Sequence, residues 1–155
     1  MPDVNFELAG RIAVNYGNEA TSGNLAWRHG ISDDELLITS SLGQGVARIV
    51  RHGGEVVLTT SDGRERRASD AETLTEQALG FRLPLAGLAN WVRGRAAPKP
   101  APEPTRERRD AAGRLAELEQ SGWKIHYLEY ADALPSRLTL TYPGLELRLA
   151  ISDWK

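Results

Sequence analysis

The residue types that most often carry out chemistry in proteins are sparse in this sequence. His29 and His52 fall in predicted loops and His126 in a predicted strand, and none has a second metal ligand at the spacing of a zinc site. The Asp33-Asp34 pair falls in a predicted turn, where aspartate is favoured because it hydrogen-bonds nearby backbone. Cysteine, G-x-S-x-G and phosphate-binding glycine loops are absent. We therefore expect no enzyme, no catalytic residue, no metal site and no cofactor.

Length and charge narrow the class of protein further. The 155 residues are enough for one domain with its own core, and we expect a single domain over residues 1–155. A formal net charge of -2 offers no general attraction to nucleic acid. No apolar run approaches the roughly 20 residues that a membrane-spanning helix needs.

Alternating apolar residues predict β-strands over about residues 4–68 and 112–154. Asp62-Gly63 predicts a tight hairpin into a short charged strand whose charges suit a sheet edge. RLAELEQ (residues 114–120) has helical propensity, but Ser121-Gly122 and an alternating segment follow it, so we favour a β-hairpin. The pattern indicates a mainly β fold with small α content, an unclosed antiparallel β-barrel of about ten to eleven strands.

Two short helices are predicted between these sets of strands, over about residues 69–94. Ser69 and Glu72 have the spacing of a capping box, and Gly80 stands where a left-handed helix end is expected. Pro84 can open the second helix and Gly94 can close it. We expect these helices to form a lid over the sheet. The proline-rich segment of about residues 95–105 cannot pair in a sheet and is expected to be a loop.

The connection at residues 40–45, SSLGQG, contains a single bulky apolar residue, Leu42. From the residues alone, two interpretations remain open. Leu42 either folds back as a plug beneath the sheet, which is the more ordinary arrangement, or it forms an exposed apolar tip.

A curled sheet and an apolar lid can together enclose a cavity that suits an acyl chain, because each buried CH₂ contributes about 0.8 kcal/mol. Strand alternation and helical spacing select the side chains that we expect to line it. They are Leu25, Trp27, Ile49, Leu74, Leu79, Leu85, Leu88, Trp91, Val92, Trp123, Leu138, Leu140, Leu147 and Leu149. The residues thus favour binding or carriage of a lipidic ligand.

Seven stretches in order along nearly the whole chain carry a family resemblance. They are FELAGRIAV (6–14), LAW (25–27), LLITSSLGQ (36–44), DAETLTEQALGFRLPLAGLANWVRG (70–94), QSGWKIHY (120–127), LPSRLTL (134–140) and LRLAISDW (147–154). In these stretches the sequence resembles the LolB family, the outer-membrane lipoprotein receptors of Gram-negative bacteria.

The resemblance implies a LolA/LolB-like unclosed barrel with a helical lid and a hydrophobic cavity for acyl chains. It implies that the protein accepts lipoproteins from the LolA–lipoprotein complex in the periplasm and inserts them into the inner leaflet of the outer membrane. It also implies a protruding membrane-insertion loop at Leu42, with Ser41 and Gly43 beside it, which favours the exposed tip. We expect a monomer.

LolB proteins carry an N-terminal lipidated cysteine, which this sequence does not contain. We therefore expect a native form anchored through a cysteine that precedes this sequence, and a natural homologue without an anchor is the alternative that stays open. Two other functions remain open: a soluble periplasmic carrier of LolA type, and a non-lipid interaction module of the cell envelope. An exposed Leu42 would separate the receptor from the carrier.

Overall fold

The computed structural model describes residues 6–40 and 42–155. The chain forms two compact units. Unit 1 contains the chain up to Ile12, Ser22–Pro84 and Ile151–Lys155, and unit 2 contains Ala13–Thr21 and Leu85–Ala150.

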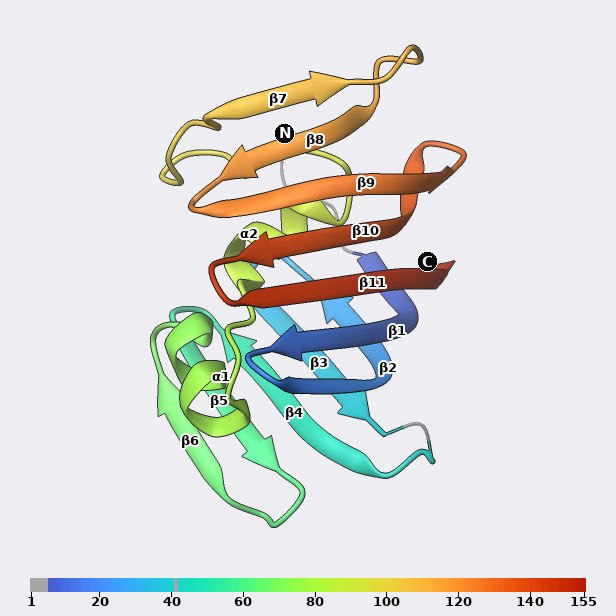
Figure 1. Cartoon of the computed structure of the whole chain (residues 1–155). Helices are drawn as coiled ribbons and strands as arrows, with labels where there is room; N and C mark the ends of the chain where they lie inside the picture. Colours follow the sequence, from blue (N-terminus) through green and yellow to red (C-terminus); the bar gives the residue numbers. More distant parts are fainter. Residues whose placement is uncertain (1–5, 41) are drawn as a thin grey trace. The chain divides into compact units, whose positions relative to one another are not determined.

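Within the described residues, eleven strands form one sheet in the order β6-β5-β4-β3-β2-β1-β11-β10-β9-β8-β7 (Figure 1). They are β1 Phe6–Tyr16, β2 Glu19–His29, β3 Asp33–Thr39, β4 Gly45–His52, β5 Glu55–Thr60, β6 Glu65–Ala68, β7 Arg106–Arg109, β8 Leu115–Gln120, β9 Trp123–Ala131, β10 Leu134–Tyr142 and β11 Leu145–Trp154. In this order β6 and β7 are the two edges, so the sheet is open. The predicted mainly β fold, with an unclosed antiparallel sheet of ten to eleven strands and two short helices, is confirmed.

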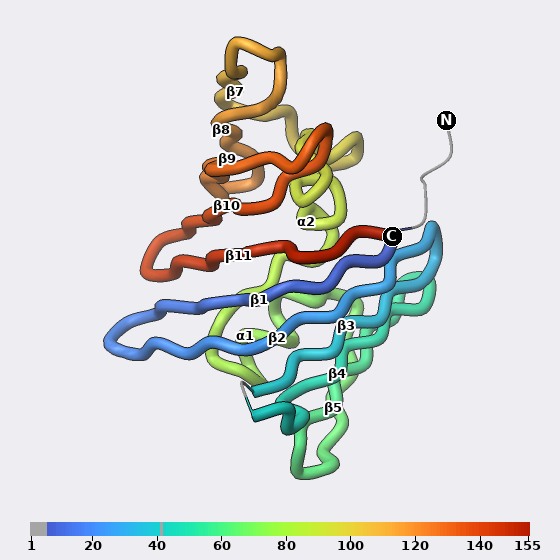
Figure 2. The backbone as a smooth tube through the Cα atoms, turned by 90° about the vertical axis from the view of Figure 1, so that its right-hand side faces the viewer, coloured from blue at the N-terminus to red at the C-terminus, as the bar shows by residue number. Residues whose placement is uncertain are grey.

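Unit 1 is a run of antiparallel hairpins, in which β2, β3, β4 and β5 lie side by side (Figure 2). Its strands alternate between buried and more exposed residues, as the period of two in the sequence predicts. Leu36 on β3, for example, pairs with Trp27 on β2 and Ile49 on β4, and all three are buried. The charged strand β6 pairs with β5 and stands last in the strand order, so its prediction as a sheet edge is confirmed.

Helix α1, Ala71–Leu79, packs against β5 and β6 in unit 1. Its N-cap is Asp70, whose carboxylate accepts from the backbone N–H of Glu72 at 3.1 Å and from the Thr73 hydroxyl at 2.7 Å. The predicted capping box at Ser69 is therefore wrong, because the aspartate one residue later serves as an equally good cap. Gly80 ends the helix in a left-handed conformation, as predicted.

Helix α2, Leu85–Trp91, belongs to unit 2, where it lies against strand β9 through the Tyr127 hydroxyl. That hydroxyl donates to the carbonyl oxygen of Trp91 at 2.6 Å. Burial raises the pKa of the Tyr127 phenol, which keeps it in the protonated form that this hydrogen bond requires.

Strands β8 and β9 form a hairpin across Ser121 and Gly122, which confirms the hairpin rather than the helix at residues 114–120. The prediction that strands resume only near residue 112 is wrong, because Arg106–Arg109 is strand β7, paired with β8. All four of its residues are exposed and charged. An edge strand of this kind lacks the apolar alternation by which a strand is recognised.

Candidate functional site

The loop between β3 and β4 presents Leu42 to solvent. The side chain of Leu42 is 87% exposed, so the interpretation of a buried plug is wrong. The loop is closed by its own backbone: Ser40 N–H donates to Gln44 O at 2.7 Å, and Gly43 N–H donates to Ser40 O at 2.9 Å. Gly43 adopts a φ of 84°, in the left-handed region that glycine tolerates without cost. Ser41, the third residue predicted for this loop, lies outside the described residues.

The hairpin that carries Leu42 exposes two more large apolar side chains near the same end. Leu37 on β3 is 41% exposed and Val46 on β4 is 39% exposed. Both point away from the buried face, to which Leu36, Ile38 and Ala47 contribute. The exposed apolar surface at this end of unit 1 therefore extends beyond one leucine.

The residues predicted to line an acyl cavity divide between the two units. In unit 1 the structure buries Leu25, Trp27, Ile49 and Leu74 and half-buries Leu79. In unit 2 it buries all nine others: Leu85, Leu88, Trp91, Val92, Trp123, Leu138, Leu140, Leu147 and Leu149. Each set belongs to the apolar interior of its own unit, and contact with an acyl chain stays a prediction.

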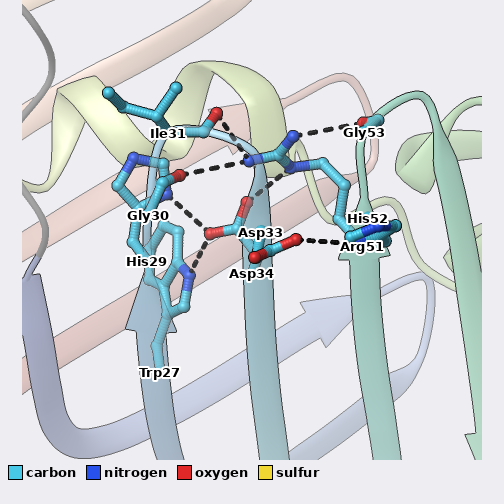
Figure 3. Close-up of polar contacts among 9 residues, drawn as sticks. All are labelled: Trp27, His29, Gly30, Ile31, Asp33, Asp34, Arg51, His52 and Gly53. Atoms are coloured by element: carbon cyan, nitrogen blue, oxygen red, sulfur yellow. Dashed lines mark hydrogen bonds and ion pairs between the residues drawn. The ribbon is translucent and has the colours of Figure 1, made fainter.

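A buried polar cluster occupies the other end of the same strands, around Asp34 (Figure 3). Asp34 is 4% exposed, and its carboxylate receives three hydrogen bonds. Trp27 Nε1 donates at 2.8 Å and His29 Nδ1 at 2.7 Å to Oδ1, and Arg51 Nε donates at 2.6 Å to Oδ2. Three neighbouring strands, β2, β3 and β4, are tied together by one carboxylate.

The pKa of Asp34 reflects this arrangement. Burial by itself would raise it, but the hydrogen bonds from His29, Trp27 and Arg51 outweigh burial, and the pKa lies below the ordinary value of an aspartate. The carboxylate is therefore ionised at neutral pH. Because an ionised carboxylate only accepts hydrogen bonds, His29 carries its proton on Nδ1.

Arg51 extends the cluster to the turn between β2 and β3. Its Nη2 donates to the carbonyl oxygens of Gly30 at 3.3 Å and Ile31 at 3.4 Å, and its Nη1 donates to Gly53 O at 3.2 Å (Figure 3). The turn is thereby held in place while the Ile31 side chain stays 64% exposed.

The expectation that Asp33-Asp34 serves a turn through backbone hydrogen bonds is wrong for Asp34, which lies in β3 and binds side chains. The position of Asp34 in the alternating pattern of its strand could have revealed this. Asp34 alternates with Leu36 and Ile38, and His29 alternates with Leu25 and Trp27, so both share the inward face.

An open pocket of about 660 Å³ lies beside this cluster in unit 1. Charged side chains dominate its wall, among them Glu7, Arg28, Glu35 and Arg48, which pair with one another: Arg28 Nε lies 3.2 Å from Glu7 Oε1 and Arg48 Nε 2.9 Å from Glu35 Oε2. A wall of this kind does not suit an acyl chain.

Within residues 6–40 and 42–155, no group of three or more acidic or histidine side chains is arranged to hold a metal ion. His52 instead contacts Asp33 at 2.6 Å and His126 lies 3.9 Å from Glu117. No helix in the described part of the chain is long and apolar enough to cross a membrane.

Comparison with known proteins identifies the family. The family model described as "Outer membrane lipoprotein LolB" matches residues 4–154. The chain belongs to the LolB family. An outer-membrane lipoprotein LolB of Thiobacillus denitrificans is 46% identical over 154 residues, which cover 97% of this chain and 80% of that protein. The LolB of an Azoarcus species is 40% identical over 97% of this chain and 78% of its own length.

A solved structure shows the same fold at low sequence identity. The crystal structure of the LolA superfamily protein NE2245 from Nitrosomonas europaea matches with a TM-score of 0.61 and 12% identity, over 100% of this chain and 87% of that one. The LolB-family chain and a LolA superfamily protein thus have similar folds.

Proposed function

We propose that this protein accepts lipoproteins from a LolA-type periplasmic carrier and inserts them into the outer membrane. Membership of the LolB family supports a role in outer-membrane lipoprotein localisation, because the similar proteins are themselves named outer-membrane lipoproteins. Binding and release of acyl chains would carry out this role without any bond being made or broken. In this proposal the protein acts as a monomer that faces the periplasm, and its native form is lipid-anchored.

The observation that carries the insertion step is Leu42, which is almost fully exposed on a turn closed by backbone hydrogen bonds. A large aliphatic side chain that is exposed to water in this way is available to an apolar partner. Transfer of one leucine into lipid gains only about 1.5–3 kcal/mol, which is too little to anchor a protein but enough for a local, reversible contact. This exposure favours the receptor over a soluble carrier.

The acceptance step is supported by the apolar interior of each unit. The side chains that pattern alone selected for the acyl site are buried or half-buried without exception. We propose that cargo moves down a gradient of affinity, from the carrier to this protein and then to the bilayer. The sequence contains no nucleotide-binding glycine loop that would couple the transfer to an energy source.

Transfer from a lipoprotein-loaded LolA, followed by release into liposomes, tests both steps separately. For Leu42→Glu we expect normal acceptance and a release rate about 10- to 100-fold lower, because a charged side chain replaces the one that enters lipid. Ile31→Glu is the matched control, since Ile31 is also exposed but lies at the other end of β3. Failure of the wild-type protein to accept cargo from LolA would overturn the receptor function and favour a non-lipid module. Equal release by the wild type and Leu42→Glu would remove Leu42 from the mechanism.

A further inference from the structure

The indole N–H of Trp123 is buried and has no hydrogen-bond partner in the described part of the chain. Trp123 is the first residue of β9 and is 1% exposed. A buried donor without an acceptor is destabilising, because it has lost its hydrogen bond to water and gained none in return. Such a group in a folded protein calls for an explanation.

The two other fully buried tryptophans are satisfied. Trp27 donates to Asp34 at 2.8 Å, and Trp91 donates to Oε1 of Gln120 at 2.9 Å. Gln120 is also the residue paired with Trp123 across the β8–β9 hairpin. The nearest strand partner of Trp123 is thus an amide that already serves the neighbouring indole.

Gln120 has no acceptor capacity left for Trp123. Its Oε1 accepts from Trp91 and from the backbone N–H of Ala97 at 2.8 Å, which uses both lone pairs. Its Nε2 donates to the carbonyl oxygens of Ala97 at 3.0 Å and Pro102 at 2.8 Å. The loop after α2 is fastened to β8 through this side chain, so Gln120 cannot turn towards Trp123 without breaking these bonds.

The surroundings of Trp123 are otherwise apolar and aromatic. Its ring centroid lies 6.5 Å from that of Trp91 and 4.9 Å from that of Tyr142. Ile125 and Leu140, which pair with each other on β9 and β10, are fully buried. A ligand that satisfies the indole must therefore bring one acceptor on an otherwise apolar body.

We propose that the Trp123 N–H binds the ester or amide carbonyl at the head of a fatty acyl chain. This inference rests on the proposed function and names, within it, a polar contact for the cargo. The carbonyl oxygen accepts the indole proton, and the hydrocarbon that follows packs among the aliphatic side chains of unit 2. The contact fixes how far the chain enters and favours acyl groups over plain hydrocarbon.

Tyr142 marks the route to this donor. Its ring is half-buried beside that of Trp123, so our proposal places the entry of the acyl head group on this side. Gly122 lets the Tyr142 ring lie close to the β8–β9 hairpin, because a Cβ at position 122 would be only 3.1 Å from Cε1 of Tyr142. Entry of an acyl head group requires the Tyr142 ring to move aside.

The test replaces the N–H without changing the shape of the ring. Trp123→3-benzothienylalanine substitutes sulfur for the N–H group, and the same replacement at Trp91 is the control. The probes are methyl palmitate, which has a carbonyl acceptor, and heptadecane, a hydrocarbon without an acceptor. We expect the ratio of ester to hydrocarbon affinity to be about tenfold higher in the wild type than in a protein without the indole N–H, as one hydrogen bond provides. The Trp123 variant should lose this preference and the Trp91 variant should keep it.

Thermal unfolding without probe gives a second readout. Removal of an unpartnered donor should leave the Tm of the Trp123 variant unchanged or raised, whereas removal of the Trp91 donor should lower it. An equal ester-to-hydrocarbon affinity ratio in the wild type and the Trp123 variant, or no binding of either probe by the wild type, would overturn the proposal. Transfer from LolA is measured separately, so a receptor that transfers cargo without carbonyl preference refutes only the role of Trp123.

Discussion

Each end of the β3–β4 hairpin lies beside a turn with an exposed apolar side chain, and the two turns are stabilised by different kinds of contact. At one end, Arg51 donates to the carboxylate of buried Asp34 and to the carbonyl oxygens of Gly30 and Ile31, which braces the turn that carries Ile31. At the other end, the loop that carries Leu42 is closed by its own backbone and the Ser40 hydroxyl, and Asn24 on β2 adds one contact, to the Ser40 carbonyl oxygen at 3.4 Å. One end depends on tertiary contacts and the other mainly on a local turn.

Because of this difference, we expect substitutions at the two ends of the hairpin to affect stability to different extents. The cluster at Asp34 contributes to stability, because a buried ion pair that loses one partner leaves a charge unpaired. The Leu42 side chain is almost fully exposed, so it can be changed with little effect on folding. A reversible membrane contact, as proposed for Leu42, requires a side chain that can leave water without disturbing the fold.

The largest effect is expected from Asp34→Asn. The change leaves Arg51 without its carboxylate and should lower the free energy of unfolding by about 2–3 kcal/mol, less than for a fully buried pair because Arg51 is partly exposed. Urea unfolding at pH 7 measures it. Asp33→Asn is the control: Asp33 pairs with His52 in solvent, and its loss should change stability by less than about 0.5 kcal/mol. Similar losses of unfolding free energy in the two variants would contradict the greater importance of the buried cluster.

A smaller effect on stability is expected when the pH is lowered. The folded-state pKa of Asp34 lies below its unfolded value, so its stabilisation is fully present above the unfolded pKa of about 4 and is lost as pH falls through the lower, folded value. The difference in stability between the wild type and Asp34→Asn should therefore shrink progressively below about pH 4. Unfolding curves for both proteins between pH 7 and pH 3 provide the measurement, and a difference that stays constant would refute this assignment.

The smallest effect is expected at the Leu42 loop. Gly43→Ala should cost about 1 kcal/mol, because alanine is strained at a φ of 84° although nothing lies within 4 Å of its Cβ. Gly45→Ala, which also meets open space but has no positive φ, is the control and should cost less. Thermal unfolding of the pair tests whether the loop depends on local conformation. A loss as large as that of Asp34→Asn would show that the loop, too, depends on tertiary contacts.

The sequence by itself determined most of the fold, because its main signals are local. Alternation at a period of two predicts the strands, and the run from Ser69 to Gly80 predicts the first helix and its left-handed end, although not its N-cap. The same local reasoning found Leu42 as the one bulky apolar residue in a polar loop, and the order of matching stretches indicated the LolB family. What it left open was whether Leu42 points outwards.

The tertiary structure decided the features that depend on partners far away in the sequence. Asp34 looked like a turn residue until β2 and β4 brought Trp27, His29 and Arg51 to its carboxylate. Strand β7 exists only because β8 pairs with it, since its four charged residues carry no apolar alternation. Periodicity reports which face of an element is buried, but not which donor meets which acceptor there. For that reason the unpartnered N–H of Trp123 could be found only once the neighbouring amide, Gln120, was seen to be fully used.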